Sequence, residues 1–288
     1  QGGALEGGGS AAGQRVVLPL GTRYRFKWDH LNANGELMVQ RALAWAMGAG
    51  TTHAGKVLLV VADAASPLTS ETDRKSLIES WGYEVILISD HASQGEFDTA
   101  LADVDVVYIA GSGSSGDVNT KLTAATVGVL SEDIGLVDEL GIAQPSFLKR
   151  SSQSIDIFDN THYVTSGFSL GTLQLYTYVP GIWTVTGLYA PGLQPLAGTE
   201  SSGSSLPPGL AVLETGAELW GGGFAAGRRV QVPWSEGSFD INALNTDGLT
   251  IFKRAIEWGA GAGAGACTST SPLLLVVGDA TNPASRDA

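Results

Sequence analysis

The sequence predicts an α/β fold, a doubly wound parallel sheet with an antiparallel β extension, repeated in tandem. Short apolar runs alternate with helical segments through residues 57–130, which is typical of parallel strands covered by helices. Beyond residue 152 the pattern changes to short strands that carry aromatic residues, which indicates the antiparallel extension. The third observation is internal repetition on the scale of a whole domain.

Three pairs of similar segments recur at nearly one spacing. The pairs are residues 57–67 with 273–283, residues 31–50 with 244–263, and residues 7–19 with 221–233. The first pair, VLLVVADAASP and LLLVVGDATNP, is identical at seven of eleven positions, and the second pair at nine of twenty. The spacings are 216, 213 and 214 residues, so chance does not explain them.

The repetition predicts how the chain is divided. We expect residues 1–50 to be the C-terminal part of a preceding repeat and residues 51–263 to be one complete α/β repeat. Residues 264–288 would then be a linker and the first strand of the next repeat. Since Gln1 is not an initiator methionine, we expect the chain to be an excerpt of a longer polypeptide.

The elements of the complete repeat follow from local patterns. Residues 57–62 are apolar on both faces, as a central parallel strand requires. The next helix is expected over 69–81, with Thr69 or Ser70 as its N-cap and Gly82 as its stop. Further strands are expected at 83–89, 104–110, 126–130, 154–157, 173–178, 182–190, 210–214 and 228–232, and helices at 93–101, 119–125 and 244–258. In the preceding fragment we expect a strand at 15–20 and then a helix capped by Asn32 or Asn34.

Composition narrows the classes of partner. The net charge is −13 and lysine is scarce, which argues against nucleic acid and anionic membranes. No run approaches the roughly 18 apolar residues of a membrane span. The single cysteine, Cys267, lies in the linker and cannot form a disulfide within this chain.

Three stretches resemble a known group of proteins. Residues 56–90 resemble the opening strand–helix–strand of the class I glutamine amidotransferase-like superfamily, which has a flavodoxin-like α/β domain. Residues 159–168 (DNTHYVTSGF) are similar to a segment of ThuA-like, or trehalose-utilisation-like, proteins, although Tyr163 stands where that family prefers proline. Residues 228–258 resemble the closing strand and helix of bacterial secreted relatives. The resemblance implies this fold over residues 56–261.

Catalytic candidates come from the turn after residues 126–130, where the amidotransferases carry a nucleophilic cysteine. This chain has Ser131, Glu132 and Asp133 there, so glutaminase chemistry is not expected. One hypothesis makes Ser131 a nucleophile with His162 as its base and Glu132 nearby. The favoured interpretation is that Ser131 or Glu132 caps the following helix, and that His162 braces a turn near Asp156 or Asp159.

Other candidate sites have similar alternatives. The loop 111–116 (GSGSSG) could cradle a phosphate, but a flexible loop is favoured. Asp63 and its repeat Asp279 could bind a ligand or cation, but a cap or turn is favoured. Asp156, Asp159 and Asn160 are the candidate calcium ligands, and no other cofactor is expected. The aromatic residues between Tyr176 and Tyr189 suggest either core packing or a carbohydrate platform.

These observations predict a non-catalytic structural repeat of a long secreted or cell-surface protein. It would form an extracellular filament, stalk or adhesive array through self-association of neighbouring repeats or chains. The alternative is a ThuA-like carbohydrate-active enzyme or sugar-binding module.

Overall fold

The computed structural model describes Val39 and residues 55–179, 181–199, 207–234 and 239–262. All of these residues except Val39 belong to one compact unit that spans residues 53–264. Several predictions therefore lie outside the described residues. They are the strand at 15–20, the capping by Asn32 or Asn34, the linker and strand of 264–288, Cys267 and Asp279.

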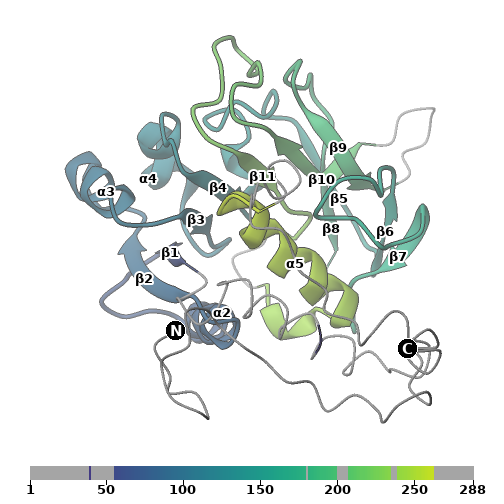
Figure 1. Cartoon of the computed structure of the whole chain (residues 1–288), viewed down its shortest axis with the longest axis horizontal. Coiled ribbons are helices and arrows are strands. Elements are labelled where there is room, and N and C mark those ends of the chain that lie inside the picture. Colours follow the sequence, from purple (N-terminus) through teal and green to yellow (C-terminus); the bar gives the residue numbers. More distant parts are fainter. Residues whose placement is uncertain (1–38, 40–54, 180, 200–206, 235–238, 263–288) are drawn as a thin grey trace, which may run out of the picture. The chain divides into compact units, whose positions relative to one another are not determined.

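A nine-stranded mixed sheet forms the centre of the unit (Figure 1). Five adjacent strands are parallel, and four antiparallel strands continue the same sheet. In spatial order these strands are β2 (Glu84–Ser89), β1 (Lys56–Val61), β3 (Val106–Ile109), β4 (Gly128–Ser131), β11 (Arg229–Gln231), β10 (Pro208–Leu213), β9 (Gln194–Gly198), β6 (Ser154–Ile157) and β7 (Gly171–Gln174). The predicted α/β class is confirmed.

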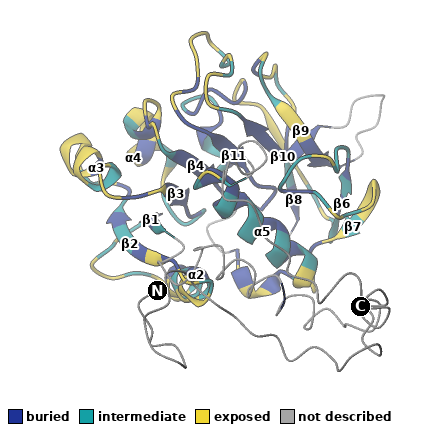
Figure 2. Ribbon diagram, in the orientation of Figure 1, coloured by how far each residue is buried: buried dark blue, intermediate teal, exposed yellow. Residues whose placement is uncertain are grey.

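Helices lie on both faces of the parallel strands because alternate strand residues enter two separate cores. On β1, Val57, Leu59 and Val61 belong to the core that includes α2 (Thr69–Ser80) and α5 (Thr246–Gly259). Leu58 and Val60 belong to the other core, together with residues of α3 (Gln94–Leu101) and α4 (Ser115–Val118). The five side chains of residues 57–61 are fully buried, and the strand lies in the dark interior of Figure 2. Residues 57–61 are all apolar because both faces of this central parallel strand are buried, as the sequence predicts.

Two strands were not predicted. β5 (Phe147–Arg150) pairs with β8 (Ile182–Val185) in a small antiparallel sheet, and β9 lies between β10 and β6. β5 ends in two charged residues and β9 contains Pro195, so neither has the apolar alternation of a typical strand. The predicted strand at 182–190 ends early, at Val185.

Two helix predictions need correction. α2 begins after Leu68, whose N–H donates to the Glu71 carboxylate at 2.7 Å, so neither Thr69 nor Ser70 is the N-cap.

The predicted helix over 119–125 is wrong. α4 ends before Asn119, and a 3₁₀ turn covers Asn119–Leu122. Asn119 has a φ of 44°, a left-handed value that an α-helix cannot continue through.

Candidate functional site at the carboxyl ends of the parallel strands

The carboxyl ends of β1, β3 and β4 meet at one edge of the sheet, which is where open α/β sheets usually bind ligands. Asp63 follows β1, the loop 111–116 follows β3, and Ser131 and Glu132 lie at the end of β4. The topology therefore places these predicted residues along the same edge. His162 is the exception.

Glu132 is the centre of a buried hydrogen-bond network. Its carboxylate lies 2.8 Å from Nη2 of Arg74 on α2, and both side chains are at most 1% exposed. Nε of Arg74 also donates to the two carboxylate oxygens, at 3.1 and 3.2 Å. Three further donors reach the same carboxylate, namely the Tyr108 hydroxyl, Nε1 of Trp234 at 3.0 Å and the Gly111 N–H at 2.8 Å.

The rest of the Arg74 guanidinium is also bound. Nη1 donates to the carbonyl of Ser70 at 2.8 Å, and Nη2 donates to the carbonyl of Phe239 at 3.0 Å. Burial acts to lower the pKa of Arg74, but the charges and hydrogen bonds of Glu132 and Tyr108 together outweigh it, and the net shift is upward. Burial and the same carboxylate raise the pKa of Tyr108 well above its ordinary value. The pair is thus enclosed, with its hydrogen-bonding groups engaged by protein atoms.

The loop 111–116 is held at three points by carboxylates. Besides the Gly111 bond, Oγ of Ser112 donates to Glu71 at 2.6 Å, and the N–H of Ser114 donates to Asp90 at 2.7 Å. Glu71 also accepts from the N–H of Ala62 at 2.9 Å, so it ties the ends of β1 and β3 together. These protein acids use backbone donors that a phosphate would need. The expected flexible loop is instead pinned to its neighbours.

Ser131 and Asp63 both have local structural partners. Oγ of the buried Ser131 donates to the carbonyl of Asp133 at 3.0 Å. Asp133, rather than Ser131 or Glu132, caps the following 3₁₀ turn by accepting from the Gly135 N–H at 2.8 Å. The exposed Asp63 accepts from the N–H of Ala65 at 2.9 Å, which is the turn-forming role that was favoured for it.

His162 lies away from Ser131 and Glu132. Its ring packs edge-on against Trp258 of α5, with centroids 5.1 Å apart, and Nδ1 accepts from the Val164 N–H at 3.2 Å. The residue after Trp258 abuts Gly128, the first residue of β4, whereas Glu132 follows the last. The length of β4 therefore separates His162 from the other two candidates. Burial lowers the pKa of His162, which favours the neutral ring.

The candidate calcium ligands are engaged separately. Asp156 accepts from Oγ1 of Thr172, and Asp159 accepts from the N–H of Thr161, both at 2.7 Å. Nδ2 of Asn160 donates to the carbonyl of Phe168 at 3.0 Å. Across the described part of the chain, no group of three or more His, Cys, Asp or Glu side chains could hold a metal ion.

The aromatic residues between 176 and 189 are divided between core and surface. Tyr176 is fully buried and packs against Phe239, with ring centroids 5.9 Å apart. Tyr178 and Tyr189 are 46% and 37% exposed. Core packing therefore accounts for Tyr176.

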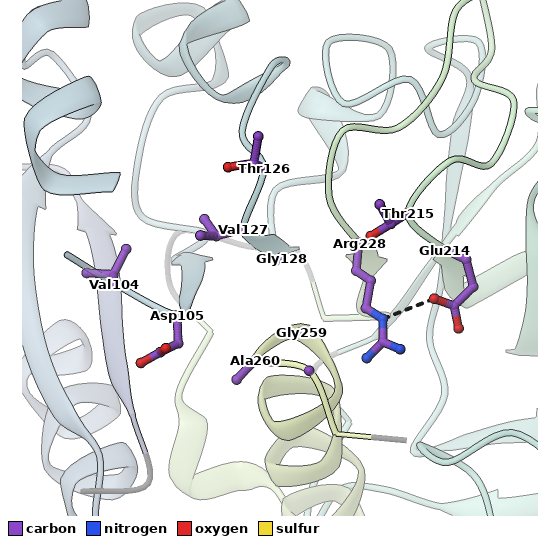
Figure 3. A pocket seen from close by; sticks show the side chains of 11 residues that line it. Val104, Asp105, Thr126, Val127, Gly128, Glu214, Thr215, Arg228, Gly259 and Ala260 are labelled. Atoms are coloured by element: carbon purple, nitrogen blue, oxygen red, sulfur yellow. Dashed lines mark hydrogen bonds and ion pairs between the residues drawn. The ribbon is translucent and has the colours of Figure 1, made fainter. Parts of the chain in front are cut away.

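An open pocket of about 510 Å³ lies at the opposite, amino-terminal ends of β3, β4 and β11 (Figure 3). Figure 3 shows Arg228 and Glu214 joined at one side of it, with Nε of Arg228 donating at 3.0 Å. Nη1 of Arg228 also donates to the carbonyls of Trp258 and Ala262, at 2.6 and 2.7 Å. The guanidinium lies 4.3 Å from the Trp258 ring centroid. Arg228 thus braces the C-terminal end of α5.

Sequence reasoning missed Arg74, Tyr108 and Trp234. One signal was present, because Arg74 and Ile78 are spaced for the same helical face and Ile78 is fully buried. A charged residue on a buried face needs an opposite charge nearby. Glu132, directly after an apolar strand, was a candidate for that charge.

A scan of protein-family models found no match to the chain, and a search of curated proteins found none. Within the described residues, no helix is long and apolar enough to cross a membrane.

Proposed function

We propose that this chain is a section of non-catalytic structural repeats from a long secreted or cell-surface protein. The repeats would build an extracellular filament, stalk or adhesive array by self-association. Domain-scale repetition motivates the proposal, because each added copy lengthens an assembly but adds no new chemistry.

The observation that carries the proposal is the closed network around Glu132. In an α/β enzyme the carboxyl ends of the strands offer exposed, partly unpaired groups to a substrate. Here Glu71, Arg74 and Glu132 are at most 1% exposed, and their bonds go to neighbouring protein atoms. The edge that could hold a catalytic site holds α2, the loop 111–116 and the end of β4 together.

Positions identical between repeats also support a structural role. Asn245, repeated as Asn32, accepts from the Gly248 N–H at 2.9 Å and caps α5. Trp258, repeated as Trp45, is 1% exposed in the core. Gly221, Gly222 and Gly223 all have φ between 82° and 97°, and all three recur as residues 7–9. These shared positions serve capping, packing and backbone geometry.

The same proposal includes the finer fold type and the tandem arrangement. The order β2-β1-β3-β4-β11 of the parallel strands is the 2-1-3-4-5 order of flavodoxin-like sheets. This order supports a doubly wound, amidotransferase-like domain in which Glu132 occupies the turn that carries the nucleophile in catalytic relatives. The domain would then have kept the fold of its catalytic relatives, while the residues at the position of their catalytic site became part of the core.

The alternative of a ThuA-like carbohydrate-active enzyme or sugar-binding module has less geometric support. It would need Ser131, Glu132 and His162 within hydrogen-bonding reach of one another. Ser131 donates to a main-chain carbonyl, and His162 packs on Trp258 near the other end of β4.

Electron microscopy of the native full-length polypeptide tests the proposal. We expect regular filaments or stalks whose axial period matches one domain of this size. Isolated particles that bind or hydrolyse extracellular polysaccharide would favour the alternative, and variants at Ser131 and His162 would then show whether these residues take part.

A further inference from the structure

A second pocket, of about 410 Å³, lies on the antiparallel part of the fold. Its volume is in the range of small-molecule sites, about 300–1,000 Å³. None of the residues that line it belongs to the network around Glu132. All of them have polar side chains, and they come from β5, β6, β7 and the segments that adjoin these strands and β9: Arg150, Ser152, Ser154, Asp156, Thr172 and Thr199.

The outer face of β6 supplies part of this polar lining. β6 lies between β7 and β9 (Figure 1). Its two isoleucines are buried in the core, so Ser154 and Asp156, which alternate with them, lie on the opposite face. Thr172 of β7 is the cross-strand partner of Asp156, and its Oγ1 donates to Oδ1 of that carboxylate at 2.7 Å. Oδ2 of Asp156 accepts no hydrogen bond from the described residues and is available to a ligand.

Arg150, at the end of β5, is the positive charge of the pocket. Among the five arginines of the described residues, it is the one whose guanidinium has no hydrogen bond or ion pair, and its buried Nε has no acceptor. Within the described part of the chain, it forms no ion pair with Asp156 either, although both residues line the same pocket. The two opposite charges are therefore separated by a space that a ligand could bridge.

Thr199, which follows β9, is a second unpaired group in the lining. The residue is only 8% exposed, and its Oγ1 is buried without a hydrogen-bond partner. Ser152 differs, because its hydroxyl accepts from the Ser154 N–H at 3.0 Å and donates to the Ser154 carbonyl at 2.8 Å. Proteins pair nearly all of their buried polar groups, so an unpaired hydroxyl and an unpaired guanidinium in one pocket indicate a partner from outside the chain.

We infer that this pocket binds a sugar acid, a pyranose that carries one carboxylate. The carboxylate pairs with the Arg150 guanidinium, which is suited to two parallel hydrogen bonds. Ring hydroxyls donate to Oδ2 of Asp156 and exchange hydrogen bonds with Ser154. A hydroxyl at the buried end serves Thr199, directly or through a bridging water. A neutral sugar would leave Arg150 unpaired, and a simple carboxylate would leave Asp156 and the hydroxyls unused.

The inference goes beyond the structural function proposed above and does not depend on it. A pocket that binds a sugar acid without hydrolysing it is compatible with a filament or stalk. Residues 150–199 occur once in this chain, so we expect one binding site per chain.

Titration calorimetry of the 288-residue chain at low salt tests the inference, with galacturonate, glucuronate, galactose, acetate and alanine as probes. We expect at least one of the two sugar acids to bind with a Kd of about 0.1–1 mM, and galactose at least about tenfold more weakly. Acetate and alanine should show no binding up to about 10 mM.

Variants assign the binding to the pocket. Arg150→Gln and Asp156→Asn should each weaken binding of the sugar acid at least about tenfold. Lys253→Gln is the matched control, because it removes the same charge as Arg150→Gln from a partly exposed residue of α5, and it should bind normally. Since the Arg150 guanidinium has no protein partner, Arg150→Gln should keep the Tm of the unaltered chain.

Three results would overturn the inference. They are no binding of either sugar acid up to about 10 mM, equal binding of acetate or alanine, and full affinity in Arg150→Gln with an unchanged Tm. None of them bears on whether the native polypeptide forms filaments, so failure here and failure of the proposed function are distinguishable.

Discussion

Arg74 and Glu132 lie 58 residues apart in the sequence, yet they form a fully buried ion pair 2.8 Å long. The pair joins α2 to the end of β4, and the Tyr108, Trp234 and Gly111 donors converge on the same carboxylate. A buried charge pair is tolerated only where its remaining hydrogen-bonding groups are also satisfied. The local structure meets that condition and so makes Glu132 part of the core.

Gly248 in α5 should tolerate no larger side chain. A Cβ at this position would lie 2.6 Å from the carbonyl oxygen of Leu175. We expect Gly248→Ala to lower the free energy of unfolding by about 2–4 kcal/mol, as measured by urea denaturation. Gly95 in α3 is the control, because a Cβ there meets nothing within 4 Å. Gly95→Ala should stabilise the protein by about 0.5–1 kcal/mol.

Equal effects of Gly248→Ala and Gly95→Ala would contradict the packing described for α5.

Arg229 of β11 should be sensitive even to lysine. Its guanidinium is 1% exposed and donates to the carbonyls of Thr123, Ala125, Val127 and Arg228. Burial lowers its pKa to about 10. A lysine cannot present this fork of donors, so Arg229→Lys should lower the free energy of unfolding by about 2–4 kcal/mol.

The partly exposed Lys253 is the control for Arg229, with its ammonium 3.5 Å from Glu257. Lys253→Met should change the free energy of unfolding by less than about 0.5 kcal/mol. A loss under 1 kcal/mol in Arg229→Lys, on the order of a surface change, would show that the carbonyls find other donors.

Glu139 should make the protein less stable as the pH rises. Burial, and next a hydrogen bond with Asp138, raise the pKa of Glu139 from 4.5 to about 7. Between these values the folded state holds a proton that the unfolded state has lost, so stability falls with increasing pH. Thermal unfolding of Glu139→Gln should show a higher Tm than the unaltered chain at pH 8, and the difference should shrink toward pH 4.5.

Glu96 should change the stability of the protein with pH in the opposite direction. Hydrogen bonds from Ser93 lower the pKa of Glu96, so its contribution is present above the ordinary glutamate pKa and is lost in acid. Glu96→Gln should therefore lower Tm at neutral pH and have less effect as the pH falls. The same pH profile for both variants would refute the assignment for Glu139.

Some of this structure could be predicted from sequence because the signals are local. The apolar run 57–61 predicts a strand buried on both faces, and β6 has the predicted bounds Ser154–Ile157. The order of the strands could not be predicted in the antiparallel half. Nothing in the sequence indicates that β10 lies beside β11 or that β7 ends the sheet.

The candidate site was predictable in position but not in chemistry. Residues that follow parallel strands must gather at one edge, so the positions of Asp63, Ser131 and Glu132 at the ends of their strands place them there. The interpretation of Glu132 as a cap failed because its partner, Arg74, is distant in sequence and lies on another element. His162 was grouped with Ser131 by residue type alone, and the fold places it against Trp258 instead.

The unfolding free energy of Glu132→Gln tests the central claim that Glu132 is structural. Loss of the charge leaves Arg74 buried without a counterion, so we predict a decrease of about 3–5 kcal/mol. The more exposed pair of Glu214 and Arg228 supplies the control, and Glu214→Gln should lose less than about 1 kcal/mol. A carboxylate kept for catalysis gives the opposite result, since removing a strained functional group is neutral or stabilising. Glu132→Gln with unchanged or increased stability would contradict the account.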